Sequence, residues 1–470
     1  MFGIYLTRNG PGVTNYHGAG DAWIVQTDFS GNVLWERCYG GSSADSPIKI
    51  IKITDSTFYL LNYTQSKDGD VLNDRDGKYW VVKINDTGDI LWENSYGGSA
   101  MGDIPVDAIL MPDNGLVMMG RFGLPGGDIT VHYGDMDVWL CRIDSTGGIL
   151  WQKTLGNHGK DNGLKIKLSS QNTILFVGGH ELTGGMIDCP DYGYVWTDVW
   201  VVELDLDGNL LNQWCYGGKY GELGRDIVDV DDGYVIAATT SSNDRDVSGF
   251  HGIPGIYASN DIWVFKIDFS GNLIWQKCLG GTSWEYPIYI TTTEDNGFIV
   301  IGNTCSLDGD VSGNHSMYDH YADIWVVKLD ENGELLWEHC FGGAATERFW
   351  GIHCVYKNDD YNYVLAANAQ YLDQDVQCDL FPNSLEYNAW LIEIKDCSFY
   401  LPLAPILTSG PDILCSTTNP VALYSIDTVQ YATGYEWLLE PEDAGTFLSI
   451  DTIAEVTWNP QFEGQAVVRA

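Results

Sequence analysis

One stretch of sequence recurs seven times along this chain of 470 residues. Each copy reads roughly Asp-x-Trp, then Val-Val-Lys-Ile-Asp, then a turn that contains glycine. The tryptophans recur every 57 to 65 residues, a period longer than that of helical-hairpin repeats. They are Trp23, Trp80, Trp139, Trp200, Trp263, Trp325 and Trp390. Because each copy holds several strand-like runs and no helical pattern, the sequence predicts an array of small β-sheets.

The copy that begins at Asp261 shows the strand order within one repeat. Four β-branched or aromatic runs follow one another, at residues 262–267, 273–279, 287–292 and 298–302. The connections between them are short, medium, short and then long before the next copy. Four antiparallel strands repeated radially make the blades of a β-propeller. We therefore predict an all-β fold, a β-propeller of four-stranded blades.

Counting strands gives seven blades as the preferred number, with six and a terminal overlap as the alternative. Five blades are complete between about Ser46 and Phe341, and a sixth uses strands near 351–355, 363–367 and 390–394. Residues 2–39 supply three strands of a seventh, which lacks its innermost strand. Because strands alternate in direction, the tight turns share one rim, and the Gly-Gly corners and long loops share the other.

Three segments carry a resemblance to a known family. They read Trp-Val-Val-Lys-Leu-Asp, Leu-Trp-Glu-x-Cys-x-Gly-Gly and Gly-x-Ile-Val-Ile-Gly-x-Thr, and they resemble the bacterial SBBP β-propeller repeat. The resemblance covers roughly residues 1–400. It implies a place in a secreted or cell-surface protein, and it implies no activity because the repeat contains no catalytic motif.

A different pattern follows the repeats. After about Cys397, prolines at 402, 405 and 411 indicate a linker, and short alternating strands follow up to Ala470. These strands resemble a PKD-like or immunoglobulin-like β-sandwich that ends in mid-strand. We predict a propeller at 1–400, a linker at 401–411 and an incomplete sandwich at 412–470. Both ends then fit a fragment of a larger protein.

Charge and hydropathy argue against several classes of binding partner. The chain has 65 acidic and 24 basic residues, so its surface repels nucleic acid and anionic lipid. It contains no apolar run of 18 residues, and its first residues carry no export signal. With the resemblance, we expect an extracellular or outer cell-surface location, with any signal in a missing part. The eleven cysteines are too few for a disulfide scaffold; Cys38, Cys215, Cys278 and Cys340 share a repeat position that suits small buried residues.

The long loops carry a repeated acidic signature that suits a hard cation. Closely spaced aspartates beside glycine can supply several oxygens to Ca²⁺, although no loop has EF-hand spacing. Asp and Gly also build turns without any metal. The candidate calcium ligands are Asp68, Asp70, Asp76, Asp308 and Asp310. The histidines at 17, 132, 251 and 315 belong to different blades and favour structural His–Asp hydrogen bonds over a metal cluster.

A third series of acids follows the corners and should ring the central channel. Its members are Asp45, Asp103, Asp161, Asp226, Glu285 and Glu347. Paired carboxylates can hydrolyse glycosides, but near-equivalent copies first indicate hydrogen-bond acceptors at strand starts. The repeat symmetry breaks most where aromatic residues flank the acids. The candidate ligand contacts are therefore Trp284, Glu285, Tyr286, Glu347, Arg348 and Trp350, although these aromatic residues can equally pack between blades.

These patterns predict binding, adhesion or display by a module of a secreted bacterial surface protein. The ligand would be a glycan or a protein held on the long-loop face, with calcium as a possible stabilising ion and no other cofactor. The alternative is a glycoside hydrolase or lyase that uses carboxylates at the channel mouth. We expect no catalytic residue, no nucleic acid and no membrane insertion; no phosphate-loop, dinucleotide or hydrolase motif occurs.

Overall fold

The structure is a computed structural model whose residues form strands, turns and loops, with no α-helix in the part described. The described residues are 1–6, 13–28, 32–72, 78–98, 103–181, 184–189, 197–255, 259–315, 321–344, 346–347, 355–357, 362–369, 375, 388–395, 407–409, 421–426, 438–440, 444–450, 453–458 and 467–469. Two compact units divide the chain, residues 1–356 with 364–392, and residues 357–363 with 393–470.

The described part of the repeat region forms seven antiparallel sheets, numbered here in chain order. The first and seventh have three strands each, β1 (Phe2–Leu6), β2 (Asp21–Thr27) and β3 (Val33–Tyr39), then β24 (Val355–Lys357), β25 (Asn362–Ala369) and β26 (Asn388–Lys395). The second contains β4 (Asp45–Thr54), β5 (Thr57–Thr64), β6 (Tyr79–Asn85) and β7 (Ile90–Tyr96). The third contains β8 (Ile104–Leu110), β9 (Leu116–Phe122), β10 (Asp137–Ile143) and β11 (Ile149–Leu155). The fourth contains β12 (Asp161–Leu168), β13 (Ile174–His180), β14 (Asp198–Leu204) and β15 (Leu210–Tyr216). The fifth contains β16 (Glu222–Val230), β17 (Gly233–Thr240), β18 (Asp261–Asp268) and β19 (Leu273–Leu279), and the sixth β20 (Glu285–Thr292), β21 (Phe298–Thr304), β22 (Asp323–Leu329) and β23 (Leu335–Phe341).

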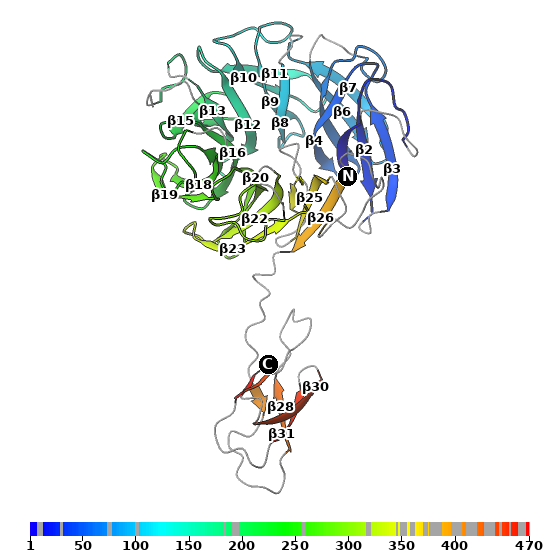
Figure 1. The fold of residues 1–470 in the computed structure, drawn as a ribbon. Coiled ribbons are helices and arrows are strands. Elements are labelled where there is room, and N and C mark those ends of the chain that lie inside the picture. The colour runs from blue at the N-terminus through cyan, green and yellow to red at the C-terminus, as the bar shows by residue number, and fades with distance from the viewer. Residues whose placement is uncertain are drawn as a thin grey trace. The chain divides into compact units, whose positions relative to one another are not determined.

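The sheets surround a common centre, as the prediction of a β-propeller requires (Figure 1). The strand that follows each glycine corner is the innermost, and β4, β8, β12, β16 and β20 pack in sequence on the preceding sheet. Parallel bridges join the end of a long loop to the following corner, for example Gly20 to Ala44 and Asn260 to Trp284. The long loops and the corners therefore share one rim, and the two tight turns of each blade share the other.

The repeated tryptophans are the buried anchors of the blades. In five copies, at Trp80, Trp139, Trp200, Trp263 and Trp325, the side chain is buried completely. Each indole N–H donates to a Glu or Gln 13 residues later on the outer strand, as Trp80 does to Glu93 at 2.9 Å. A buried indole needs such an acceptor. The Asp-x-Trp pattern thus specifies both the apolar core and its polar partner.

A second tryptophan, on the outer strand, packs on the turn of the next blade. Trp35 lies against Gly88, and Trp275 against Gly333, both of which have positive φ. Asn212 replaces this tryptophan in the fourth sheet. Trp214, two residues along and on the same strand face, lies against Gly271 instead. The exception at Asn212 is therefore a shift of the packing residue, and the contact itself is kept.

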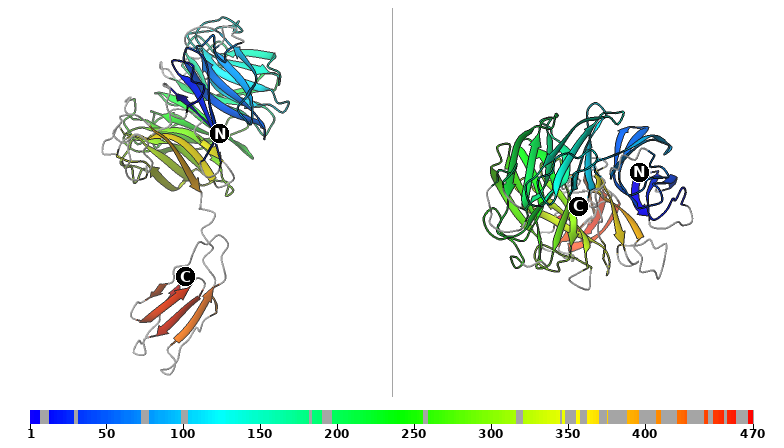
Figure 2. Two further views of the ribbon diagram at one scale, coloured as in Figure 1. Left: turned by 90° about the vertical axis from the view of Figure 1, so that its right-hand side faces the viewer. Right: turned by 90° about the horizontal axis from the view of Figure 1, so that it is seen from above.

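The second unit contains two sheets in its described part. One has the order β27 (Leu407–Ser409), β28 (Val421–Ile426), β31 (Ile453–Trp458) and β30 (Gly445–Ile450), and the other pairs β29 (Leu438–Glu440) with β32 (Val467–Arg469). Figure 2 shows β28, β30 and β31 side by side in this unit. The PKD-like or immunoglobulin-like assignment, and the domain boundaries given above, stay predictions.

Candidate functional site

The acids that lie four residues after the second residue of a glycine corner cap that corner, and four of them are the first residues of inner strands. In five copies the carboxylate accepts a hydrogen bond from the backbone N–H four residues earlier, at 2.6–3.0 Å. These acids are Asp45, Asp161, Glu222, Glu285 and Glu347, and all are completely buried. Asp226, the member expected from the sequence in the fifth sheet, lies four residues further along β16. Glu222 occupies the repeat position instead, because it follows the second corner glycine by four residues, as Asp45 follows Gly41.

Hydroxyl groups donate to the remaining oxygen of three of these acids, Asp45, Glu222 and Glu285. Thr240 donates to Oε1 of Glu222 at 2.7 Å, and Thr304 donates to Oε1 of Glu285 at 2.8 Å. Ser306 donates its backbone N–H to the same oxygen of Glu285 at 3.2 Å. Burial raises the pKa of Glu222 and of Glu285 to about 7, although these donors oppose the rise. The carboxylates of Glu222 and Glu285 are thus held by the protein on both oxygens.

The aspartates of the Asp-x-Trp pattern stand beside histidines. The Nδ1–Oδ2 distances are 2.9 Å for His17–Asp21, 2.7 Å for His251–Asp261 and 2.8 Å for His315–Asp323, and His132 Nε2 is 3.8 Å from Asp137 Oδ2. The hydrogen bond to Asp261 raises the pKa of His251. Each histidine therefore pairs with the aspartate of its own blade, in agreement with the structural role expected from the sequence.

The aspartates of the long loops form hydrogen bonds with the backbone of the preceding glycine corner. Asp68 Oδ1 accepts the N–H of Ser42 at 2.7 Å, and Asp70 exchanges backbone and side-chain hydrogen bonds with Gly40. Asp308 and Asp310 repeat these contacts on Thr282 and Gly280. Asp76 lies outside the described residues. These hydrogen bonds are those of turn-forming aspartates, and calcium at this set stays a prediction.

The candidate ligand contacts of the sixth sheet lie on two faces of one strand. Glu285 is completely buried towards its corner, whereas Trp284 and Tyr286, its neighbours, are partly exposed. The rings of Trp284 and Tyr286 lie 6.3 Å apart, edge to face. The guanidinium of Arg225, from the inner strand of the fifth sheet, stands 4.3 Å from the centre of the Tyr286 ring. We call Arg225, Trp284 and Tyr286 the aromatic patch.

Of the three remaining candidate ligand contacts, only Glu347 lies in the described part of the chain. Glu347 is buried and accepts the N–H of Gly343 at 2.8 Å, so it repeats the geometry of Glu285. Arg348 and Trp350 lie outside the described residues. The role of this group in ligand contact stays a prediction.

The inner strands also carry a belt of polar side chains, of which the sequence analysis predicts only Asp226, and there as a corner acid. A β-bulge interrupts each of these strands, and the belt residue follows it. The belt is Lys49, Asp107, Lys165, Asp226 and Tyr289. Lys49 Nζ is 2.6 Å from Asp107 Oδ1, and Asp107 Oδ2 accepts the N–H of Ile166 on the next inner strand. Asp226 does the same for Ile290. The carboxylates therefore accept N–H groups just beyond the bulges of neighbouring inner strands and join neighbouring sheets.

The cysteine position of the outer strands is buried in all four copies that carry cysteine. Cys38, Cys278 and Cys340 are free thiols. Cys215 instead forms a disulfide with Cys189, whose Cα lies 5.8 Å away. The sequence interpretation as a small buried residue is confirmed at all four positions, but it does not include the bridge at Cys215.

Comparison with known proteins identifies no family. No family model matches the chain, and no curated protein matches it. The solved structures it resembles include a protein of unknown function from Dyadobacter fermentans, with 12% identity, a TM-score of 0.43, and coverage of 74% of this chain and 94% of that one. A protein of unknown function from Bacteroides caccae has 12% identity and a TM-score of 0.34, and the match covers 68% of this chain and 90% of that one. A puromycin-hydrolyzing peptidase from Mycobacterium tuberculosis has 10% identity and a TM-score of 0.41, and the match covers 87% of this chain and 57% of that one. Similarities this weak carry no argument about function. The described residues include no helix long and apolar enough to cross a membrane.

Proposed function

We propose that the repeat region is a non-enzymatic module that binds a glycan on its long-loop rim, within a secreted or surface protein. The aromatic patch is the observation that carries the proposal. Aromatic rings pack on apolar sugar faces, and a guanidinium donates to sugar or uronate oxygens in a fixed fork. Trp284 and Tyr286 are partly exposed beside Arg225, so both kinds of contact stand on one surface.

The burial of the neighbouring acid argues against hydrolysis. A general acid must lie within hydrogen-bond reach of the substrate oxygen that it protonates. Glu285 has no exposed surface, and its two oxygens accept from Gly281, Thr304 and Ser306. One observation favours the alternative of a carbohydrate-active enzyme: the pKa of Glu285, raised to about 7 by burial, suits a general acid.

A glycan array tests the binding proposal. The panel should contain neutral and uronate-bearing glycans, and the variants are Trp284→Ala and Tyr286→Ala. We expect each to weaken binding at least tenfold, which corresponds to about 1.4 kcal/mol. Tyr133→Ala is the control, because Tyr133 is an exposed tyrosine from another long loop. Absence of binding to every glycan, or equal loss in the control, contradicts the proposal.

A hydrolysis screen on the same glycans separates the enzyme from the binding module. The matched variants are Glu285→Gln and Glu222→Gln, since both acids cap a corner but Glu222 is flanked by Gly221 and Leu223 instead of aromatic residues. We expect no turnover by the unmodified protein. Turnover that Glu285→Gln abolishes and Glu222→Gln retains would establish the enzyme instead.

A further inference from the structure

The fourth sheet departs from the repeat at three positions near one corner. His180 stands where the second, fifth and sixth sheets carry a threonine that donates to the corner acid. Six residues later, Met186 stands where four other long loops carry an aspartate that accepts the N–H of the first corner glycine. Three residues further, Cys189 replaces the glycine of the next two loops, at 249 and 313. Residues with oxygen donors, or with no side chain, are thus replaced by residues with nitrogen and sulfur donors.

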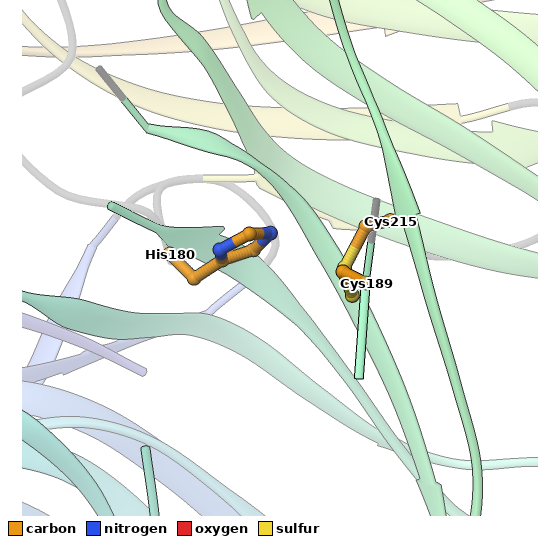
Figure 3. A group of neighbouring side chains, drawn as sticks. All are labelled: His180, Cys189 and Cys215. Atoms are coloured by element: carbon orange, nitrogen blue, oxygen red, sulfur yellow. A yellow bond between two sulfur atoms is a disulfide. The ribbon is translucent and has the colours of Figure 1, made fainter. Parts of the chain in front are cut away.

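These substitutions bring three donor atoms of one metal-binding type together. The ligand atoms of His180, Cys189 and Cys215 all lie within 4.8 Å of one another, and no other such group of His, Cys, Asp or Glu occurs among the described residues. Figure 3 shows the imidazole of His180 directed towards the Cys189–Cys215 bridge. His180 ends strand β13 and Cys215 lies on β15, so two of the three donors stand on regular strands.

We propose that reduction of the Cys189–Cys215 disulfide converts this group into a binding site for a thiophilic divalent metal ion of the zinc type. A thiol reductant such as dithiothreitol supplies two electrons and two protons, and the bridge becomes two thiols while the reductant becomes a cyclic disulfide. The metal ion then displaces both thiol protons to solvent and is bound by two thiolate sulfurs and one imidazole nitrogen.

The dimensions and the charge of the group suit that ion. Zinc–ligand bonds of about 2.0–2.3 Å place tetrahedral donors roughly 3.5–3.8 Å apart. The imidazole nitrogen already lies within 4.8 Å of both sulfur atoms, and reduction releases the two bonded sulfur atoms to separate to that distance. Two thiolates neutralise a divalent ion, so the site can stay buried without an uncompensated charge. His180 and Cys215 are 1% and 8% exposed, whereas Cys189 is partly exposed and gives the ion a route from solvent.

The surroundings favour a thiophilic ion over a hard one. Met186 removes the loop carboxylate that would offer oxygen to Ca²⁺ or Mg²⁺. Cys189 and Met186 pack with Cys215 against an apolar cluster that includes Leu155 and Trp200. Three protein ligands leave one tetrahedral position for water or another donor, as in zinc sites with an open position. The site is therefore distinct in place and in ligand type from the aromatic patch and from the aspartate loops.

Zinc binding to the full chain, before and after reduction, tests the proposal. The oxidised protein should bind no zinc at this site, and the reduced protein, freed of dithiothreitol under anaerobic conditions, should bind one equivalent in equilibrium dialysis. Co²⁺ as a probe should add thiolate charge-transfer absorbance only after reduction. We expect Cys189→Ser and His180→Ala each to weaken binding by at least about tenfold.

Cys278→Ser is the matched control, because Cys278 occupies the position of Cys215 in the next sheet and faces Gly249 there. Its zinc binding should equal that of the unmodified protein. The double variant Cys189→Ser/Cys215→Ser measures binding by the other thiols. Equal binding in that double variant, unchanged affinity in His180→Ala, or loss of the fold on reduction, followed by circular dichroism, each overturns the proposal.

Discussion

The fourth and fifth sheets are neighbours with the same strand order, yet they hold their corners by different means. In the fifth sheet, the carboxylate of Glu222 accepts hydrogen bonds from Gly218 and Thr240, and the carboxylate of Asp246 accepts one from Gly217. In the fourth sheet, Asp161 keeps only the bond from Asn157, and its other oxygen is buried without a partner.

The fourth sheet also contains a disulfide. Cys189 ties its long loop to the outer strand at Cys215, where the fifth sheet has only Gly249 against Cys278. The blade geometry survives this exchange, since the register of the strands is the same in both sheets. A polar network of several hydrogen bonds can thus be replaced by one covalent link, and the two sheets should respond differently to substitution.

Removal of the covalent link should have the largest effect. The bridge closes a loop of 26 residues, so Cys189→Ser/Cys215→Ser should lower the free energy of unfolding by about 3 kcal/mol. Cys278→Ser, at the equivalent free thiol of the fifth sheet, should cost less than about 1 kcal/mol because it removes no link. Denaturant unfolding of the oxidised proteins measures both. Equal losses would mean that the link contributes nothing beyond packing.

The pH dependence of stability should give the next largest effect, and it should involve the acids of both corners. Burial raises the pKa of Glu222 from 4.5 to about 7, so the folded protein binds more protons than the unfolded chain between these values. The stabilisation from this proton is complete below pH 4.5 and is lost as the pH rises through 7, with a slope of about 1.4 kcal/mol per pH unit. Glu222→Gln should therefore flatten the fall in unfolding free energy between pH 5 and 8.

Asp161 supplies the comparison for that titration. Its pKa is also raised to about 7, by burial first and then by the charge of Asp137. The slope that remains in Glu222→Gln should therefore shrink again in Glu222→Gln/Asp161→Asn. An unchanged slope in both variants would show that neither acid carries a proton in the folded state near neutral pH.

The sequence predicts the structural features that all repeats share, and it does not predict the contacts that occur in one sheet only. Strand alternation, the Asp-x-Trp anchor and the glycine corners specify blades, because each is a local pattern repeated with little change. The corner acids are predictable for the same reason. In the fifth sheet the predicted acid is Asp226, whereas counting four residues from the second corner glycine selects Glu222, which lies on the same strand.

The cluster at His180 could not be predicted because it depends on contacts between distant positions. The long loops differ in length, so the equivalence of Cys189 with Gly249 emerges only when the loops are aligned from the last residue of the second strand. Arg225 was missed for a related reason. It lies at a bulge of β16, and only the packing of neighbouring inner strands brings it onto Tyr286.

The smallest effect concerns the single hydroxyl that distinguishes the two acids. Thr240→Val removes a donor to the charged form of Glu222 and should raise the pKa of that carboxyl by roughly 1. His180→Thr should do the reverse in the fourth sheet, since it offers a donor to the unpartnered oxygen of Asp161. The pKa of Asp161 should fall by a similar amount, and NMR titration of the side-chain carboxyl carbons follows both. Opposite shifts would mean that the hydroxyl sets the difference between the corners. Shifts of the same sign, or none, would contradict this and leave burial as the common cause.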